Sequence, residues 1–363
     1  MNENSRENCF RFPDEHTWNA LSVHWAHTLF GLTAELTKAF WLNHREVIPK
    51  MRTEPTCGKV FAGAGSVIQV IGVLMSTLLL ASCGVGWEDT PTPNITTAST
   101  TTPKYSTEMR ITLGGSNLDQ GIVVSSPGCT GMRRSTTPPF ESSATLAYYL
   151  CTVSAVGNNE LSFSTSTGSS LGKLPYDVLL PQVTMTISNG LGIAGNVVYT
   201  LRPDIVATTV VNFLAYVNSG YYSGTVFHRI GHTTAPSSTN VLRMIQGGGF
   251  ISSGTSLVQK SPLYAPIPLE VGKGLSNVQW SIAMARTTTP NSATSQFFIN
   301  YLANTLLDTS GGGYAVFGTV TAGFSVVDAI SAVTPCTART GITDPPYCTP
   351  DVNILVNSAA QTR

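Results

Sequence analysis

The stretch VVNFLAYVNSGYYSGTVFHRI, residues 210–230, decides the fold of this 363-residue chain because it joins a clear helix pattern to a clear strand pattern. Between residues 206 and 217, apolar residues recur at spacings of three and four, which predicts a helix. A glycine follows, and a helix would end there. The apolar residues are Val206, Val210, Phe213, Leu214 and Val217, and the glycine is Gly220. The second half predicts a strand over residues 224–228.

Outward from this stretch, short apolar runs predict further strands. Upstream, QVTMTIS at residues 182–188 alternates apolar with polar residues, as a half-buried strand does. Downstream, strand patterns occur at 241–246, 279–284, 296–300 and 314–320, and 324–333 predicts a second helix with Phe324, Val327 and Ile330 on one face. Many strands with one early and one late helix favour a closed barrel capped by helices, since closure leaves no open sheet edge.

Four segments in this region resemble the cyclophilin family of peptidyl-prolyl cis/trans isomerases. They are residues 210–230, MIQGGGF at 244–250, IAMARTTTPNSATSQFFIN at 282–300 and YAVFGTV at 314–320, and they follow the family's order across about residues 182–333. The resemblance implies a mainly β fold, a closed antiparallel eight-stranded barrel with two helices, in a domain of residues 180–363. It also implies prolyl isomerase activity on proline-containing polypeptide substrates.

Prolyl isomerisation makes modest chemical demands. The enzyme must lower a rotation barrier of roughly 18–20 kcal/mol that arises from the partial double-bond character of the peptide bond, and no bond is broken. A hydrogen-bond donor aimed at the twisted amide, an apolar pocket for the proline ring and donors for the substrate backbone are sufficient. The resemblance therefore implies neither a metal ion nor a cofactor.

The resemblance also assigns roles to individual residues. It makes Arg229 the catalytic arginine, a residue type that is always charged and offers several donors in a planar fork. Gln246 and Gln296 match residues that bind the substrate backbone and orient the arginine. The remaining matches are pocket residues Met244, Phe298 and Leu307, the pair Ala285 and Arg286 whose backbone lies along the substrate, and Tyr314, which replaces a His.

The chain departs from the family at three places. Arg243 stands where most members carry a Phe in the proline pocket, and residues 231–240 add a polar insertion that we expect beside the active site. Leu306 replaces the Trp that favours cyclosporin binding, so we expect weak cyclosporin sensitivity. Loss of an aromatic pocket wall would remove about 1–3 kcal/mol of burial, which weakens catalysis without necessarily abolishing it.

Two other function classes compete with an active isomerase. One is a catalytically weak cyclophilin-fold binding or chaperone module, and the other is a structural envelope lipoprotein, which would not need Arg229, Gln246 and Gln296 together. A nucleic-acid partner is disfavoured, since 20 Lys and Arg balance 20 Asp and Glu and no basic run occurs.

The N-terminal region carries an export pattern. Arg52 and Lys59 precede a long apolar run at 60–80, and LASC at 80–83 resembles the lipobox of bacterial lipoproteins. We expect residues 1–50 to be a mis-assigned upstream extension, 51–82 to be a lipoprotein signal peptide, and Cys83 to be lipidated. No Asp follows Cys83, so we expect anchoring in the cell envelope at the outer membrane, facing the periplasm. The alternative is an uncleaved transmembrane helix.

Residues 83–104 are rich in Thr and Pro and suggest an extended tether. Residues 105–173 contain short strand patterns between turn residues, which predicts a small β-sandwich-like module that serves as a spacer or binds a partner. Within it, Gly157, Asn158 and Asn159 suggest a hairpin turn.

Four cysteines follow residue 83, which allows three disulfide connectivities. Local pairing of Cys129 with Cys151 and of Cys336 with Cys348 closes the shortest loops, and an oxidising compartment favours disulfides. Free buried thiols are the alternative. A metal site is disfavoured because no His lies near any of the four.

Overall fold

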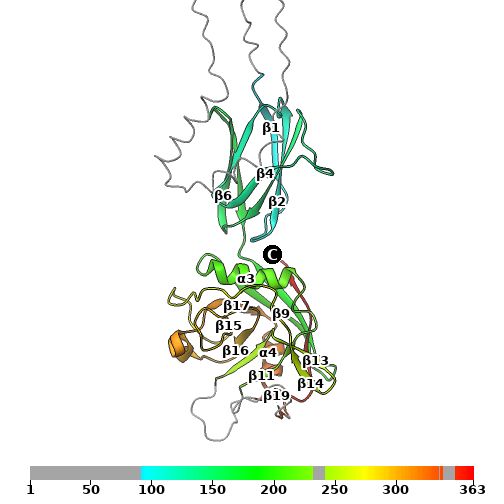
Figure 1. The fold of residues 1–363 in the computed structure, drawn as a ribbon, viewed down its shortest axis with the longest axis vertical. Helices are drawn as coiled ribbons and strands as arrows, with labels where there is room; N and C mark the ends of the chain where they lie inside the picture. Colours follow the sequence, from blue (N-terminus) through cyan, green and yellow to red (C-terminus); the bar gives the residue numbers. More distant parts are fainter. Residues whose placement is uncertain (1–90, 232–241, 335, 338–347) are drawn as a thin grey trace, which may run out of the picture. The chain divides into compact units, whose positions relative to one another are not determined.

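The computed structural model describes residues 91–231, 242–334, 336–337 and 348–363 of the chain (Figure 1). By its internal contacts the chain divides into residues 1–83 and 84–363. The predicted extension, signal peptide and lipidated Cys83 lie outside the described residues, as does nearly all of the predicted polar insertion at 231–240. No helix in the described part is long and apolar enough to cross a membrane.

Residues 94–178 form two antiparallel sheets. One has the order β1 (Asn94–Thr100), β2 (Glu108–Ser116), β5 (Leu146–Val153), β4 (Cys129–Arg134), and the other has β3 (Ile122–Ser125), β6 (Gly157–Thr165), β7 (Ser170–Val178). Both sheets alternate buried and exposed residues, and Ile111, Tyr149 and Phe163 are among those that enter one hydrophobic core. The sequence therefore correctly indicated a small sandwich-like module.

The sequence-based limits of this module were wrong at both ends. Strand β1 lies inside the predicted tether, and β7 runs to Val178, past the predicted end at 173. The Thr residues of β1 are β-branched and suit a strand, and Ile95 and Ala98 pack against the core. The hairpin turn at 157–159 was also wrong, because β5 pairs with β2 and β4 while β6 pairs with β3 and β7.

A disulfide joins Cys129 of β4 to Cys151 of β5, with the Cα atoms 5.6 Å apart. Cys151 is fully buried, so the bridge lies in the module's core. Cys348 is also disulfide-bonded. The backbone of Cys336 lies in a short ladder of β18 (Cys336–Thr337) with β19 (Thr349–Pro350), and the side chain of Cys336 lies outside the described residues.

Residues 182–361 form an antiparallel sheet that closes on itself. Its order is β10 (Val226–Phe227), β20 (Ile354–Gln361), β8 (Gln182–Ser188), β9 (Ala194–Leu201), β17 (Val316–Ala322), β15 (Ser281–Met284), β16 (Phe297–Asn300), β12 (Met244–Gly247), β11 (Arg229–Ile230). Only His228 separates β10 from β11, so residues 226–230 act as one strand that pairs with β20 at one end and β12 at the other. Counted this way, the barrel has the eight strands that the sequence predicted.

In the part of the barrel that the structure describes, two α-helices accompany the strands. Helix α3 (Ala207–Asn218) buries the apolar residues that predicted it, and Gly220 follows it with a φ of 71°. Helix α4 (Phe324–Ser331) buries Val327 and Ile330, while Phe324 stays 39% exposed against the ring of Trp280. The rest of the described barrel region includes the hairpin of β13 (Phe250–Ser253) and β14 (Ser256–Gln259) and two short 3₁₀ turns, η1 (Thr305–Asp308) and η2 (Ser310–Gly312).

Candidate active site

One pocket on the barrel gathers side chains from segments far apart in the sequence. Its walls come from strands β11, β12 and β16, from the residue Leu242 before β12, from the segment after β15, from η1 and from Tyr314 after η2. The lining residues are Arg229, Leu242, Met244, Gln246, Ala285, Arg286, Phe298, Leu307 and Tyr314. Every residue that the sequence assigned to catalysis or substrate binding lies here except Gln296, which contacts the pocket residue Gln246.

The floor of the pocket is apolar. Met244, Phe298 and Leu307 are each less than 5% exposed and belong to a small cluster that is completed by Ala283 and Val316. Alternation along β12 places Met244 and Gln246 on the same face of the strand, and Gln246 pairs with Phe298 of β16. The ring of Tyr314 meets Phe298 edge-on, with the ring centroids 5.8 Å apart. This floor suits a compact apolar ring such as that of proline.

A line of hydrogen bonds borders the floor. Arg229 Nη1 donates to Gln246 Oε1 at 3.1 Å, and Gln246 Nε2 donates to Gln296 Oε1 at 2.9 Å. Because the oxygen of the Gln246 amide faces the arginine, its nitrogen faces Gln296, and the two bonds together fix the orientation of that amide. The guanidinium group of Arg229 therefore keeps a defined position at the edge of an apolar pocket.

His228 adds no charge next to Arg229 at neutral pH. Its side chain is buried and lies against the ring of Phe250, with centroids 4.5 Å apart. Burial is the main cause that lowers the pKa of His228 to about 4, and the charge of Arg229 lowers it further. The imidazole is thus neutral at pH 7, and the arginine is the charged group on this strand.

Arg286 fixes the opposite wall. Its Nε and Nη2 donate to the carbonyl oxygen of Gly313 at 3.0 and 2.8 Å, and Nη2 also donates to Gly311 O at 2.6 Å. Nη1 donates to Thr287 O at 2.9 Å, and the guanidinium carbon lies 4.4 Å from the centroid of the Tyr314 ring. Arg286 thereby ties the glycine-rich turn at 310–313 and Tyr314 to the segment after β15.

The lining of the pocket corrects the expectation that Arg243 lies in the proline pocket. Leu242, and not Arg243, occupies the wall for which an aromatic residue was expected. The backbone of Arg243 exchanges hydrogen bonds with the Asn304 side chain at 2.8 and 3.0 Å. Its side chain approaches Tyr301, whose pKa is raised by burial and lowered in part by Arg243. Residues 242 and 244 share a face in an extended segment while 243 faces away, and this alternation in the sequence could have identified Leu242.

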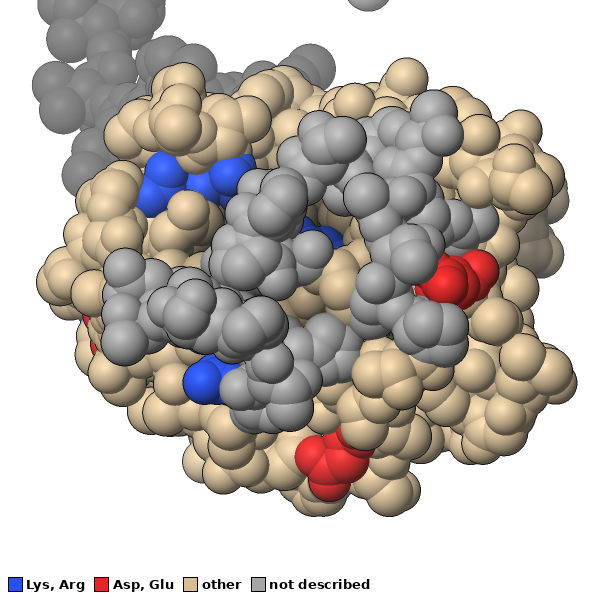
Figure 2. Space-filling view, turned by 90° about the horizontal axis from the view of Figure 1, so that it is seen from below, with Lys and Arg blue, Asp and Glu red and all other residues tan. Residues whose placement is uncertain are grey.

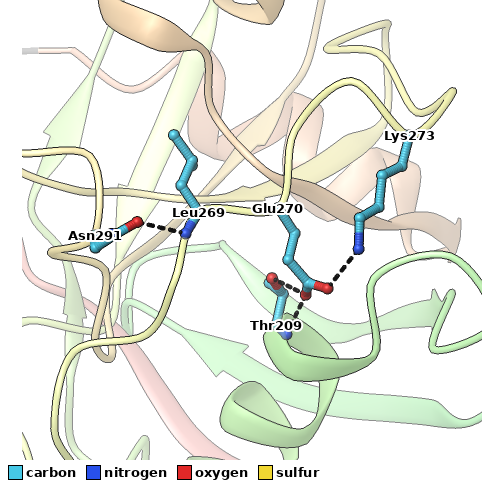
Figure 3. Close-up of polar contacts among 5 residues, drawn as sticks. All are labelled: Thr209, Leu269, Glu270, Lys273 and Asn291. Carbon is cyan, nitrogen blue, oxygen red and sulfur yellow. Dashed lines mark hydrogen bonds and ion pairs between the residues drawn. The ribbon is translucent and has the colours of Figure 1, made fainter.

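A second hollow shares Tyr314 with this pocket, and Glu270 and Lys273 are among the residues that line it. Figure 3 shows the polar contacts of Glu270. There Glu270 Oε2 accepts hydrogen bonds from the backbone N and Oγ1 of Thr209, at 2.8 and 2.9 Å, and Oε1 accepts one from Lys273 Nζ at 2.9 Å. Thr209 lies in the first turn of α3, whose N-cap, Val206, makes no side-chain cap bond. The carboxylate of Glu270 therefore satisfies a helix N–H that the local sequence leaves open.

The bonds at Glu270 also decide its charge. Burial alone would raise the pKa of this carboxyl group, but the bonds from Lys273 and Thr209 outweigh burial and hold the pKa below its usual value. Asp308, which lines the same hollow, is held in the same way, since bonds from Ser276 and Asn277 outweigh burial and lower its pKa. The sequence pattern did not reveal this role of Glu270, because Thr209, the helix residue that it binds, is 61 residues away in the chain.

Charged side chains are sparse on the face of the molecule that Figure 2 shows. Lys and Arg form a few small patches there, and Asp and Glu form others, on a surface that is otherwise uncharged where the structure describes it. Leu306 is 60% exposed and is not among the residues that line the pocket. Within the described part of the chain, no group of three or more His, Cys, Asp or Glu residues could hold a metal ion.

Comparison with known proteins points to one family. Residues 182–352 match the family model of cyclophilin type peptidyl-prolyl cis-trans isomerases. The chain is 47% identical over 151 residues to peptidyl-prolyl cis-trans isomerase cyp18 of Streptomyces antibioticus, a match that covers 40% of this chain and 83% of that protein. It is 40% identical over 153 residues to peptidyl-prolyl cis-trans isomerase B of Escherichia coli K12, which covers 41% of this chain and 84% of the relative.

Among solved structures, a cyclophilin type peptidyl-prolyl cis-trans isomerase of Cryptosporidium parvum aligns over 50% of this chain and 98% of its own, with 21% sequence identity and a TM-score of 0.37.

Proposed function

Because the chain belongs to the cyclophilin-type peptidyl-prolyl cis-trans isomerase family and is a prolyl isomerase, we propose that Arg229 is its catalytic residue. This proposal rests on one observation. Hydrogen bonds link Arg229 to Gln246 and Gln246 to Gln296 along the edge of the apolar pocket. This line of hydrogen bonds places a fixed donor beside an apolar seat that suits a proline ring.

The proposed mechanism needs only binding and hydrogen bonding. The proline ring sits on Met244, Phe298 and Leu307, and the backbone around it is held by Gln246 and by the segment at Ala285. As the prolyl amide twists, its nitrogen becomes pyramidal and gains a lone pair that accepts a hydrogen bond from the Arg229 guanidinium. This bond is stronger in the twisted state than in the planar one, so it lowers the barrier to rotation.

A protease-coupled isomerisation assay on an Ala-Pro peptide tests this proposal, with the wild-type protein beside Arg229→Ala. We expect acceleration by the wild type and loss of about 10²–10³ in kcat/KM in the variant, as when one preorganised donor is removed from an active site. Equal acceleration by both proteins would remove Arg229 from catalysis. A folded wild type without activity, but with retained peptide binding, would favour the alternative of a binding or chaperone module.

We further propose that the protein works in the cell envelope, held there by a lipid on Cys83, and assists the folding of envelope proteins. Two observations support this: the export pattern at 52–83 and the disulfide between Cys129 and Cys151, a bond typical of oxidising compartments. Spontaneous prolyl isomerisation takes roughly 10–100 s, so secreted clients would fold faster with a catalyst nearby.

Metabolic labelling with palmitate and fractionation of the envelope test this location. Wild-type protein should carry the label and fractionate with the outer membrane, and Cys83→Ser should lose the label. An unprocessed, unlabelled wild type that still fractionates with membranes would favour the uncleaved helix instead.

A further inference from the structure

The side chain of Arg286 has an unusual set of partners for a charged group at a binding pocket. All of its hydrogen bonds go to backbone carbonyl oxygens, those of Thr287, Gly311 and Gly313. No carboxylate of the described residues lies within 4.0 Å of its guanidinium. Carbonyl groups orient a guanidinium but do not neutralise it, so its positive charge remains in full at the pocket wall.

The hydrogen bonds of Arg286 also leave one of its N–H groups available as a donor. A guanidinium offers five N–H groups in a rigid fork. Two bonds to Gly313, one to Gly311 and one to Thr287 use four of them, and one hydrogen on Nη1 has no partner among the described residues. Arg286 is partly exposed and lines the pocket, so substrate can reach this hydrogen.

The two carboxylates that line the neighbouring hollow already have other partners. Glu270 and Asp308 line the hollow beyond Tyr314, where Glu270 binds Thr209 and Lys273, and Asp308 binds Ser276 and Asn277. On the pocket side of Tyr314, Arg229 and Arg286 are the charged lining residues among those that the structure describes, and both are positive. The electrostatic field in the pocket therefore favours an anionic substrate group over a cationic one.

We propose that Arg286 is a specificity-determining residue that makes this isomerase prefer substrates with an Asp or Glu within two residues before the proline. The inference rests on the proposed isomerase site, and it adds the class of polypeptide that the site selects. Arg286 contacts the flanking side chain of the substrate and not the twisting amide, so its contribution appears in KM more than in kcat.

The experiment compares matched peptides in the protease-coupled assay. One pair has Glu or Gln directly before the proline, the other has Glu or Gln one residue earlier, and the uncatalysed rate of each peptide is subtracted. For the wild type we expect the Glu peptide of at least one pair to have a kcat/KM about two- to fivefold higher than its Gln counterpart. Added salt should reduce that ratio toward one, since partly exposed charge pairs are screened.

Two variants assign the preference to Arg286 rather than to Arg229. Arg286→Lys keeps the positive charge and should keep most of the preference for Glu peptides. Arg286→Gln removes the charge and should bring the ratio to one, and any general loss from a loosened glycine turn affects both peptides of a pair equally. A preference that survives in Arg286→Gln would overturn the proposal.

The wild-type result separates this inference from the proposed function. Activity with equal kcat/KM on Glu and Gln peptides would refute the role of Arg286 and leave the isomerase intact. A wild type that accelerates no peptide would refute the isomerase site itself.

Discussion

Arg229 and Gln246 lie directly opposite each other on strands β11 and β12, and their side chains meet through a 3.1 Å hydrogen bond. The cross-strand register brings them together, since residues paired on neighbouring strands have adjacent side chains on the same face. Gln296, just before β16, extends the line by one bond. Gln246 of β12 thus holds the arginine in place, and Gln296, next to β16, holds Gln246.

The first prediction concerns the shape of the Arg229 side chain. Arg229→Lys keeps the charge but loses the planar fork that lets one group bond Gln246 and still face the substrate. We expect kcat/KM on an Ala-Pro peptide to fall about 10²-fold, with the free energy of unfolding changed by less than about 0.5 kcal/mol. Urea denaturation checks the folding, and a variant within a few-fold of wild-type activity would contradict the prediction.

The second prediction concerns Gln296, a positioning residue that acts through Gln246. Gln296→Leu removes the acceptor for Gln246 Nε2, so the amide is free to turn and the arginine loses a fixed partner. We expect kcat to fall about tenfold, which corresponds to the net free energy of about one hydrogen bond. Gln296→Glu retains an acceptor and should keep clearly more activity than Gln296→Leu. Equal losses in the two variants would indicate a merely structural role.

Sequence reasoning identified the barrel because its cues are local. The helix period at 206–217, the strand alternation at 182–188 and the ordered motifs each depend on neighbouring residues, and the structure confirms the elements they predict. The structure also gathers most of the predicted site residues around one pocket. Arg229, Met244, Gln246 and Phe298 lie in strands whose pairing the family resemblance implies, and the other residues lie in segments close to those or neighbouring strands.

The features that sequence reasoning missed depend on contacts distant in sequence. Strand β20 pairs with β8 and β10, more than 100 residues away, and the sequence analysis predicted no strand at 354–361. Glu270 caps helix α3 from a loop 61 residues further along the chain. Leu242 was missed for a different reason. Beside the insertion, the resemblance to the family matched Arg243 to the pocket position, and only the alternation of side chains along the segment before β12 selects Leu242 instead.

The third prediction separates Leu242 from Arg243. Leu242 lines the pocket, so Leu242→Ala removes apolar surface that the proline ring would bury, and kcat/KM should fall about tenfold, mainly through KM. The Arg243 side chain approaches Tyr301, and only its backbone binds Asn304, so Arg243→Ala should leave kcat/KM within about twofold of the wild type. Steady-state kinetics on the same peptide measure both. A larger loss in Arg243→Ala than in Leu242→Ala would contradict the placement.

The fourth prediction concerns the disulfide of the N-terminal β module. Replacing Cys129 and Cys151 by Ala opens a loop of 22 residues and should lower the stability of the module by about 3 kcal/mol. The pocket residues all lie between 229 and 314, so kcat/KM should not change. The double variant is preferable to a reducing agent, which would also act on the disulfide at Cys348. Denaturation followed by tyrosine fluorescence checks the first outcome, and the isomerase assay checks the second.

The fifth prediction is a pH dependence that originates at Glu270. Its pKa in the folded protein lies below the usual 4.5, because bonds from Lys273 and Thr209 outweigh burial. A depressed folded pKa stabilises the protein at pH values above the unfolded pKa, and this contribution is lost as the pH falls through the folded pKa. At pH 7 we therefore expect Glu270→Gln to lower the free energy of unfolding by about 1–3 kcal/mol.

Urea denaturation at a series of pH values between 7 and 3 measures this dependence. The difference between wild type and Glu270→Gln should be constant down to about pH 5 and then shrink as the carboxylate takes up a proton. Glu141→Gln is the matched control, since Glu141 is exposed and makes no hydrogen bond or ion pair with described residues. A difference that stays the same down to pH 3 would mean that Glu270 stabilises α3 by its shape and not by its charge.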